Sequence, residues 1–174
     1  LVGRLYRRLQ VLKLRSFGEY YRHVAYGPAE ERVRMLDAIC TNETWFFRNR
    51  KQFDLLGEQL ARQWRNRLRS PGRPGTVRVW SAACSTGEEP FSIAMVLADS
   101  LPGWEIDIRA TDLSTRALEQ ASAATWSIEK SKDIPPPFLK RHMLRGSGSQ
   151  EGKMRAATSL RALVRFERLN LNDL

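Results

Sequence analysis

The chain has 174 residues, of which 42% are hydrophobic and 28% charged, a mixture typical of folded globular proteins rather than disordered ones. No apolar run approaches the roughly 20 residues that a membrane-spanning helix needs. The two cysteines, Cys40 and Cys84, have no His or Cys neighbours at metal-ligand spacing, so we expect neither a disulfide framework nor a metal site.

The formal net charge of +10 is not evenly spread along the chain. Residues 1–75 hold 16 Lys and Arg against 7 Asp and Glu, whereas residues 76–174 hold 13 against 12. A local excess of positive charge predicts an anionic partner, which is either nucleic acid or an acidic protein surface. The sequence also lacks a recognisable secretory signal, so we expect a cytoplasmic protein.

The first 40 residues are expected to form a small all-helical domain. In the first predicted helix, leucines recur at helical spacing, at Leu1, Leu5, Leu9 and Leu12. Four arginines lie elsewhere around this helix: Arg4, Arg7, Arg8 and Arg15. Further helices are predicted at residues 17–25 and 29–39, because Gly27-Pro28 interrupts the pattern. One stripe of the first helix therefore packs inward, and the arginines face solvent or a partner.

A long amphipathic helix is predicted from about Trp45 to Leu68. Its apolar face carries Phe53, Leu56, Leu60, Trp64 and Leu68. The helix ends at the Pro- and Gly-rich residues 70–75, the clearest linker in the chain. We therefore divide the sequence into a helical domain at 1–40, a motif-bearing helix and linker at 41–75, and an α/β domain at 76–174.

After the linker, strands and helices alternate. We predict strands at residues 77–82 and 104–110, each followed by a helix, at 88–101 and 114–124. Pro90 lies in the first turn of one helix and Ser114 caps the other. This order indicates a parallel sheet covered by helices. A loop at 130–137, a short helix at 138–143, a hairpin turn at 146–152 and a strand at 162–171 are expected to follow.

The turn after the first of these strands is built from small residues. Ala82, Ala83, Ser85 and Gly87 let the backbone approach a ligand, as in doubly wound folds that hold adenosine-containing cofactors. Asp112, at the end of the second strand, is placed to accept hydrogen bonds from ribose hydroxyls. The turn does not match G-x-G-x-x-G, and an ordinary tight turn between strand and helix fits the pattern equally well.

Two acidic residues, Glu88 and Glu89, begin the helix where a bound diphosphate would lie in a dinucleotide-binding fold. Carboxylates repel phosphate and attract cations. S-adenosylmethionine has no phosphate and carries a sulfonium and an ammonium, so this helix start favours it over NAD or ATP. The same two residues also fit a simpler role, in which they complement the helix dipole.

Two long motifs carry a family resemblance. Residues 41–48, T-N-E-T-W-F-F-R, resemble the T-N-x-T-x-F-F-R motif of the CheR-type chemotaxis protein-glutamate O-methyltransferases. Residues 80–94, W-S-A-A-C-S-T-G-E-E-P-F-S-I-A, resemble the family's W-S-A-A-x-S-T-G-E-E-P-Y-S-I-A signature, with Cys84 in place of Ala and Phe91 in place of Tyr. The similarity covers nearly the whole chain.

The resemblance implies an α/β fold in which a small N-terminal helical domain precedes a partial Rossmann-like methyltransferase domain with a β-subdomain at about 143–160. It implies S-adenosylmethionine as cofactor and S-adenosylhomocysteine as product. The matching cofactor-site positions are Asn42, Thr44, Arg48, Glu89, Asp112, Asn170 and Leu171. Arg48 matches the arginine near the transferred methyl group, and we expect it to position the acceptor. An acceptor glutamate is already ionised at neutral pH, so no histidine base is needed.

The family also implies the partners. Its substrates are glutamates on cytoplasmic helices of methyl-accepting chemotaxis receptors, and the basic residues Arg4, Arg7, Arg8 and Arg15 offer such helices a complementary surface. A solvated basic face is the plainer interpretation of these arginines. Gly146, Gly148, Gly152 and Arg155 resemble the β-subdomain by which some members hold a receptor's C-terminal tail, although an ordinary glycine-rich hairpin would look similar. We expect neither nucleic-acid binding nor membrane insertion.

Two alternatives stay open at this point. A nucleic-acid methyltransferase would explain the basic N-terminal part, and residues 133–138, D-I-P-P-P-F, loosely match the D-P-P-Y motif of amino-methylating enzymes. A non-catalytic docking module would keep the cofactor site without the reaction. The sequence begins without Met and stops before the family's later motifs, so we expect this chain alone to be weakly active or inactive.

Overall fold

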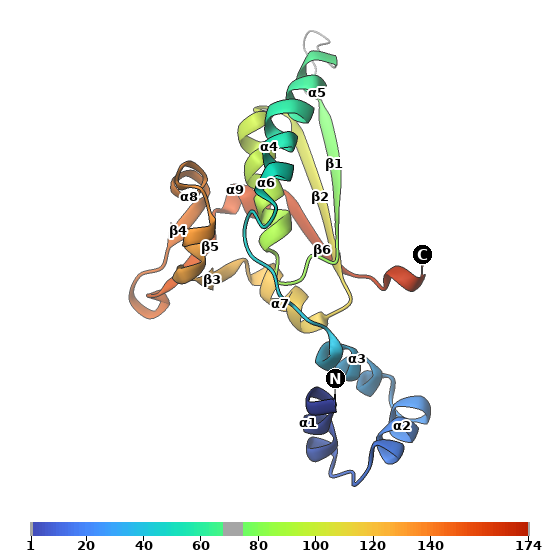
Figure 1. The fold of residues 1–174 in the computed structure, drawn as a ribbon. Coiled ribbons are helices and arrows are strands. Elements are labelled where there is room, and N and C mark those ends of the chain that lie inside the picture. The colour runs from blue at the N-terminus through green and yellow to red at the C-terminus, as the bar shows by residue number, and fades with distance from the viewer. Residues whose placement is uncertain (1, 68–74, 174) are drawn as a thin grey trace.

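The computed structural model describes residues 2–67 and 75–173, and it has a mixed α/β fold around a parallel sheet (Figure 1). This sheet has the strand order β1-β2-β6, formed by β1 (Thr76–Ala82), β2 (Glu105–Asp112) and β6 (Val164–Arg168). The predicted α/β class and its parallel sheet are confirmed. The predictions for Leu1, Leu68 and residues 70–74 of the linker lie outside the described residues.

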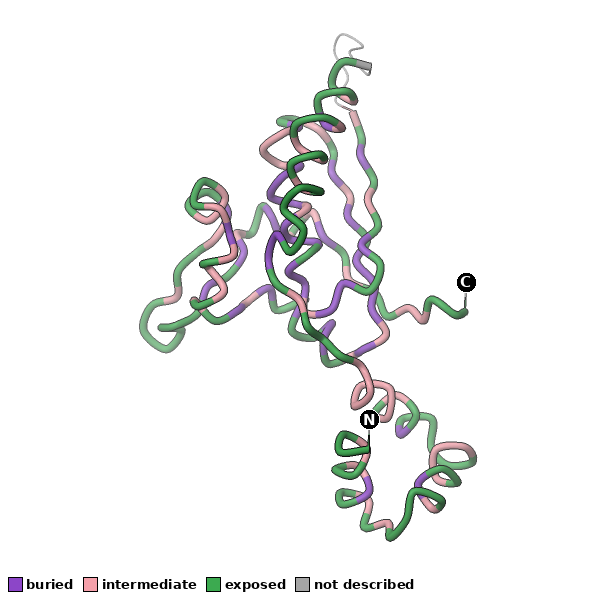
Figure 2. The backbone as a smooth tube through the Cα atoms, viewed as in Figure 1, coloured by how far each residue is buried: buried purple, intermediate pink, exposed green. Residues whose placement is uncertain are grey.

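One face of the parallel sheet packs on α6 (Glu88–Ser100). Alternate residues of β2 point to this face, where Ile108 and Ala110 are completely buried, and the buried side of α6 includes Met95 and Leu97. Figure 2 shows the buried residues concentrated along β2 and α6. In β2, every second side chain points toward α6, and the apolar side of α6 packs against them. Together these two faces form the core that the sequence predicts.

The opposite face of the sheet carries charged side chains within the described residues. Arg109 on β2 pairs with Glu167 on β6 at 2.8 Å, and Asp107 on β2 pairs with Arg165 on β6 at 2.6 Å. Register places Arg109 directly beside Arg165, so each arginine reaches diagonally to a carboxylate of the neighbouring strand. Exposed ion pairs of this kind contribute little to stability, about 0–1 kcal/mol each.

The helix expected at residues 45–68 begins later than predicted. It starts at α4 (Arg50–Asp54), continues through a π-helical segment η1 (Leu55–Leu60) and finishes with α5 (Ala61–Arg67). Phe47 adopts a left-handed backbone conformation with φ of 53°, and its N–H donates to Ser92 Oγ at 3.1 Å instead of to a helical carbonyl. The preceding residues are therefore an extended segment and turn that run over α6.

Three helices precede this segment and lie at one end of the molecule, beside α7 (Thr115–Ala123), as Figure 1 shows. They are α1 (Val2–Leu12), α2 (Phe17–Tyr26) and α3 (Ala29–Ile39). A buried carboxylate joins all three, because Glu31 on α3 accepts hydrogen bonds from Arg8 on α1 and from Tyr20 on α2. Asp37 accepts a hydrogen bond from Thr115 at 2.6 Å and so links α3 to α7.

A second, antiparallel sheet has the order β3-β5-β4, formed by β3 (Thr125–Ser127), β4 (Met143–Arg145) and β5 (Lys153–Ala156). The expected hairpin across residues 146–152 is confirmed, with a short 3-10 turn η3 (Gly148–Gln150) at its tip. A Cβ at Gly146 would lie 2.0 Å from the carbonyl oxygen of Gln150, so this turn requires glycine. Strand β3 was not predicted.

The chain between β3 and β4 is more regular than expected. Residues 130–137 were predicted as a loop, but a 3-10 helix η2 (Ile128–Asp133) and helix α8 (Pro136–His142) occupy this stretch. The remaining elements are α9 (Thr158–Arg161) and the 3-10 turn η4 (Leu171–Asp173). Across residues 2–67 and 75–173, no helix combines the length and apolar character that crossing a membrane requires.

Candidate cofactor site

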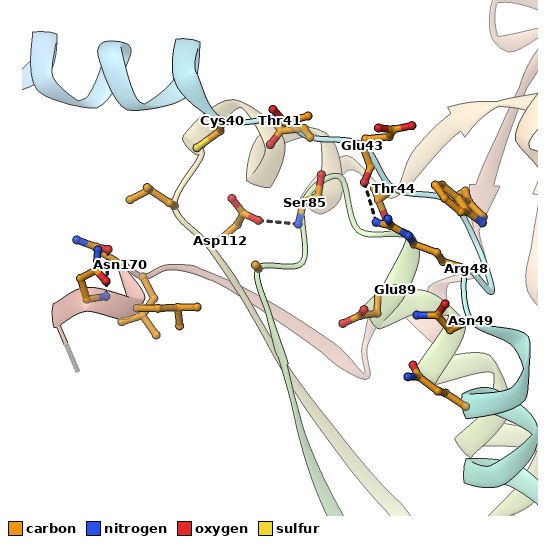
Figure 3. A pocket seen from close by; sticks show the side chains of 18 of the residues that line it. Cys40, Thr41, Glu43, Thr44, Arg48, Asn49, Ser85, Glu89, Asp112 and Asn170 are labelled. Atoms are coloured by element: carbon orange, nitrogen blue, oxygen red, sulfur yellow. Dashed lines mark hydrogen bonds between the residues drawn. The ribbon is translucent and has the colours of Figure 1, made fainter. Parts of the chain in front are cut away.

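A cavity of about 440 Å³ lies at the carboxyl ends of the parallel strands, in the size range of small-ligand pockets. It receives side chains from the 40–53 segment, the turn after β1, the start of α6, the end of β2 and the segment after β6 (Figure 3). All seven residues expected to contact a cofactor line it: Asn42, Thr44, Arg48, Glu89, Asp112, Asn170 and Leu171. The fold thus brings together positions up to 129 residues apart in the sequence.

The turn after β1 forms the floor of the cavity and has an unusual backbone. Ala83, Ser85 and Gly87 all have positive φ, at 61°, 50° and 94°. Left-handed conformations cost energy for residues with a side chain, and they are kept where surrounding contacts enforce them. Here Asp112 supplies one such contact, because its Oδ2 accepts the Ser85 N–H at 2.7 Å.

Asp112 has a larger structural role than expected. Besides the Ser85 N–H, its carboxylate accepts the Ser114 N–H at 2.9 Å through Oδ1. It is buried and still lines the cavity, so only the remaining lone pairs of its two oxygens are available to a ligand. The residue therefore fastens the floor of the cavity to the end of β2.

The two acidic residues at the start of α6 point in different directions, which corrects the expectation that both face the ligand. Glu89 is exposed, lines the cavity and accepts a hydrogen bond from Ser81 Oγ at 2.6 Å. Glu88 is completely buried away from the cavity, where it pairs with Lys130. Only Glu89 can meet a ligand, because successive helical residues lie about 100° apart around the axis.

The motif at residues 41–48 is anchored by its two phenylalanines. Phe46 is 1% exposed and packs edge-on against Trp126, and Phe47 stacks on Phe138. With these rings buried, the side chain that follows them, Arg48, is left at the cavity. Its guanidinium lies 4.5 Å from the ring centroid of Trp45 and donates to the Glu43 carbonyl at 3.3 Å.

The opposite wall comes from the chain after β6. The Leu169 N–H donates to the Asp112 carbonyl at 3.0 Å and directs the following residues across the end of the sheet. The Asn170 side chain accepts the Asn172 N–H at 3.2 Å and donates to Asp173, so it also stabilises η4. Leu171 is 46% exposed at the rim.

The cavity has an acidic lining. Among the described residues around it are three carboxylates, Glu43, Glu89 and Asp112, and one cationic side chain, Arg48. Such a set disfavours phosphate-bearing cofactors and suits a ligand with positive charge. Across the described part of the chain, no group of three or more His, Cys, Asp or Glu is arranged to hold a metal ion.

Cys84 lies in the turn, and it is a structural residue. Its side chain is 1% exposed, and burial, together with the nearby Asp112 carboxylate, raises the pKa of its thiol to about 12. A thiol with so high a pKa is protonated near neutral pH and is a poor nucleophile. The substitution of Cys for the family's usual Ala therefore preserves a small buried side chain.

Comparison with known proteins identifies the family. The model of the CheR methyltransferase, SAM binding domain, matches residues 42–174. The chain belongs to the CheR methyltransferase family. It is 41% identical to chemotaxis protein methyltransferase 2 of Pseudomonas aeruginosa and 40% identical to the chemotaxis protein methyltransferase of Escherichia coli, with 97% of the chain covered in each case.

These relatives are longer than the chain. It spans 58% of the Pseudomonas protein and 57% of the Escherichia coli protein. A further relative is the probable biofilm formation methyltransferase WspC of Pseudomonas aeruginosa, which is 34% identical over 96% of the chain and of which the chain covers 38%. Similarity within the CheR family thus extends to relatives whose names refer to different processes.

The arginines expected to meet a receptor are not equivalent in this CheR chain. Arg8 is bound by Glu31, and Arg4 donates to the Ile39 and Cys40 carbonyls and to Thr41 at the end of α3. Arg7 is exposed on α1. Arg15 is also exposed, but it lies in the connection after α1, which corrects its expected place on the helix.

The expected tail-binding residues lie in and beside the second sheet. Gly146, Gly148 and Gly152 form the connection between β4 and β5, and Arg155 is exposed on β5. Because β5 is the central strand, a peptide could add to this sheet only beside β3 or β4. The D-I-P-P-P-F stretch at residues 133–138 contributes nothing to the cavity, so the structure gives no support to an amino-methylating motif.

Three residues near the cavity were not singled out from the sequence. Trp45 occupies a variable position of the family motif, and only the structure shows its ring against Arg48. Ser92 accepts the Phe47 N–H and donates to the Glu88 carbonyl, so it ties the motif segment to α6. Lys130 was assigned to a loop. Of these three residues, only Ser92 has a signal in the sequence. A serine four residues after Glu88 on a predicted helix can donate its hydroxyl to the Glu88 carbonyl.

Proposed function

We propose that the protein binds S-adenosylmethionine in the 440 Å³ cavity and transfers its methyl group to glutamate side chains of methyl-accepting chemotaxis receptors. The products would be glutamate methyl esters and S-adenosylhomocysteine. The observation that carries the proposal is the convergence of seven residues from four separated segments on one acidic cavity, in a chain that belongs to the CheR family.

The chemistry of the cavity fits this cofactor. Glu89 and Glu43 supply negative charge toward the sulfonium and ammonium groups, while Asn42 and Asn170 supply amide donors and acceptors. The free lone pairs of Asp112 remain candidates for the ribose hydroxyls. No lysine is among the described lining residues, which is unlike a site for a diphosphate.

Catalysis in this proposal depends on positioning. S-adenosylmethionine, when bound, supplies an activated methyl group on a positively charged sulfur. The acceptor carboxylate is an anionic nucleophile at neutral pH and requires no base from the protein. Arg48 is placed at the cavity, where its guanidinium can orient one carboxylate oxygen while the other attacks. The cation–π contact with Trp45 holds the Arg48 guanidinium in place and weakens its attraction for the acceptor carboxylate.

The receptor would approach across the basic N-terminal helices. Helices α1–α3 would act as a separate small domain, and a groove of about 970 Å³ between α1, α3 and α7 continues to the cavity through Cys40 and Asn42, which line both. Exposed Arg7 and Arg116 lie on this groove and suit an acidic helix. The reaction would take place in the cytoplasm, where receptor signalling helices are found.

A receptor tail would bind to the second sheet as an added strand. Strand β4 is an edge strand of this sheet, and Leu144 on it is 56% exposed. A pocket bounded by Leu144, the 146–150 turn and Arg155 lies beside it. Arg155 could pair there with an acidic side chain of the tail, which adds specificity to main-chain pairing.

Transfer of a radiolabelled methyl group to a purified receptor signalling fragment tests the proposal. In the full-length protein we expect label that base releases as methanol, the behaviour of a glutamate ester. Arg48→Ala should lower the rate of transfer about 100-fold, a larger effect than its effect on cofactor affinity, because a misplaced acceptor loses orientation. Arg50→Ala, an exposed arginine outside the cavity lining, is the matched control. Cofactor binding without any transfer, or label in nucleic acid instead, would contradict the proposal.

A further inference from the structure

A completely buried carboxylate lies next to the cofactor cavity without taking part in it. The side chain of Glu88 is 0% exposed, and its Oε2 accepts the Thr86 hydroxyl at 2.6 Å. Its Oε1 pairs with the ammonium of Lys130, which comes from η2, 42 residues further along the chain. A buried carboxylate that lacks a cationic partner strongly destabilises a folded protein, so the structure around Glu88 depends on its pairing with Lys130.

The pair holds the cavity floor. Thr86 belongs to the turn that contains Ser85, and its carbonyl also accepts the indole N–H of Trp126 on β3 at 3.1 Å. Two groups from the β3–η2 stretch, the Trp126 indole and the Lys130 ammonium, therefore fasten the turn from outside. The strained conformation of Ala83 and Ser85 is thus supported from one side by Asp112 and from the other by this stretch.

The same helix start holds the second wall of the cavity. The Glu88 carbonyl accepts the Ser92 hydroxyl at 2.7 Å, and Ser92 Oγ accepts the Phe47 N–H at 3.1 Å. Phe47 directly precedes Arg48. A shift of Glu88 would consequently be felt both in the turn and in the segment that carries the arginine.

We propose that Lys130 is a positioning residue of the cofactor site. It does not line the cavity, and it acts by neutralising Glu88 so that the first turn of α6, the β1–α6 turn and the segment before Arg48 keep their places. The inference rests on the proposed function, since it assigns to Lys130 a share in the binding of S-adenosylmethionine.

The two partners differ in burial, and this gives the proposal a distinctive consequence. Glu88 is 0% exposed, whereas Lys130 is 34% exposed. Without Lys130 the carboxylate stays charged in a site that excludes water. Without the charge of Glu88, the ammonium can still reach solvent along its flexible stem. Lys130→Met should therefore weaken cofactor binding far more than Glu88→Gln does. Adding Glu88→Gln to Lys130→Met should restore the binding.

Calorimetric titration of the full-length protein with S-adenosylhomocysteine at pH 8 tests the inference. We expect Lys130→Met to weaken binding about 10-fold or more. Glu88→Gln, Lys130→Arg and the Glu88→Gln/Lys130→Met double variant should bind within about 3-fold of the parent protein. Lys132→Met, an exposed lysine of the same 3-10 helix, is the matched control.

The outcomes separate the two levels of the account. Absence of binding by the parent protein would refute the proposed function. Normal binding by both the parent and Lys130→Met at pH 8 would refute the positioning role alone. If Lys130→Met fails to fold, the double variant decides, because a double variant that binds much more weakly than Glu88→Gln overturns the charge-neutralisation argument.

Discussion

Replacing Asp112 by Asn removes the charge that holds the cavity floor to the sheet. The Asp112 carboxylate accepts the Ser85 and Ser114 N–H groups at 2.7 and 2.9 Å. An amide keeps one acceptor oxygen but turns an NH₂ group toward the other N–H, so one buried donor loses its partner. Hydrogen bonds to charged groups contribute about 1.5–3 kcal/mol, and the expected loss of stability is of that size.

Thermal unfolding with and without S-adenosylhomocysteine measures this loss. For a domain of this size, about 1.5–3 kcal/mol corresponds to a fall in Tm of roughly 3–12 °C. The stabilisation by ligand should also shrink, because the Ser85 turn lines the cavity. Asp107→Asn is the matched control on the same strand, since its partner Arg165 is exposed and the pair contributes at most about 1 kcal/mol. Equal Tm values for the two variants would refute the structural role of Asp112.

Three further predictions concern the turn and the N-terminal helices. Gly87→Ala should lower the free energy of unfolding by roughly 1–3 kcal/mol, because φ at Gly87 is 94° and the new Cβ would lie 3.0 Å from the Cβ of Ala121. Chemical denaturation measures this loss. Gly103 has open space around it, so a loss no larger than that of Gly103→Ala would contradict the prediction. Burial opposes ionisation of Glu31, but the contacts with Arg8 outweigh burial, so the pKa of Glu31 lies below its ordinary value of 4.5. The stability that this carboxylate contributes should be complete above pH 4.5 and should fall as the pH drops through the pKa of the folded state. Thermal unfolding followed from pH 7 to pH 3 measures this, and an unchanged Tm would refute it. Cys84, with a pKa of about 12, should resist iodoacetamide at pH 8 until the protein is denatured, and rapid labelling of the native protein would count against its burial.

The site could be predicted where local sequence determines geometry. The change from helical to alternating periodicity places β1, α6 and β2, and the predicted Ser114 cap is confirmed by its hydrogen bond with the Ala117 N–H. Once strands and connecting helix are placed in a parallel sheet, the turn and Asp112 must meet at its carboxyl edge. The motif at residues 41–48 reached the same cavity only through the family resemblance, because no local rule joins it to the sheet.

The remaining features depend on contacts between distant segments. Glu88 and Glu89 are the same residue type at neighbouring positions, yet Glu88 is buried and Glu89 lines the cavity. The partner of the buried Glu88 is Lys130, which lies on an element that sequence periodicity did not reveal. The late helix start at Arg50 follows from the burial of Phe46 and Phe47 against side chains far along the chain. Strand β3 has three residues and becomes recognisable only through its pairing with β5.

The acidic cavity and its preference for a cationic, phosphate-free adenosine cofactor form the central claim. Calorimetric titration of the full-length protein with S-adenosylmethionine, and separately with NAD and ATP, tests it most directly. The structure predicts saturable binding of S-adenosylmethionine at about one molecule per chain, weakened by Glu89→Gln, and no measurable binding of NAD or ATP. Binding of NAD or ATP as tight as that of S-adenosylmethionine, or no binding of S-adenosylmethionine at all, would contradict the account.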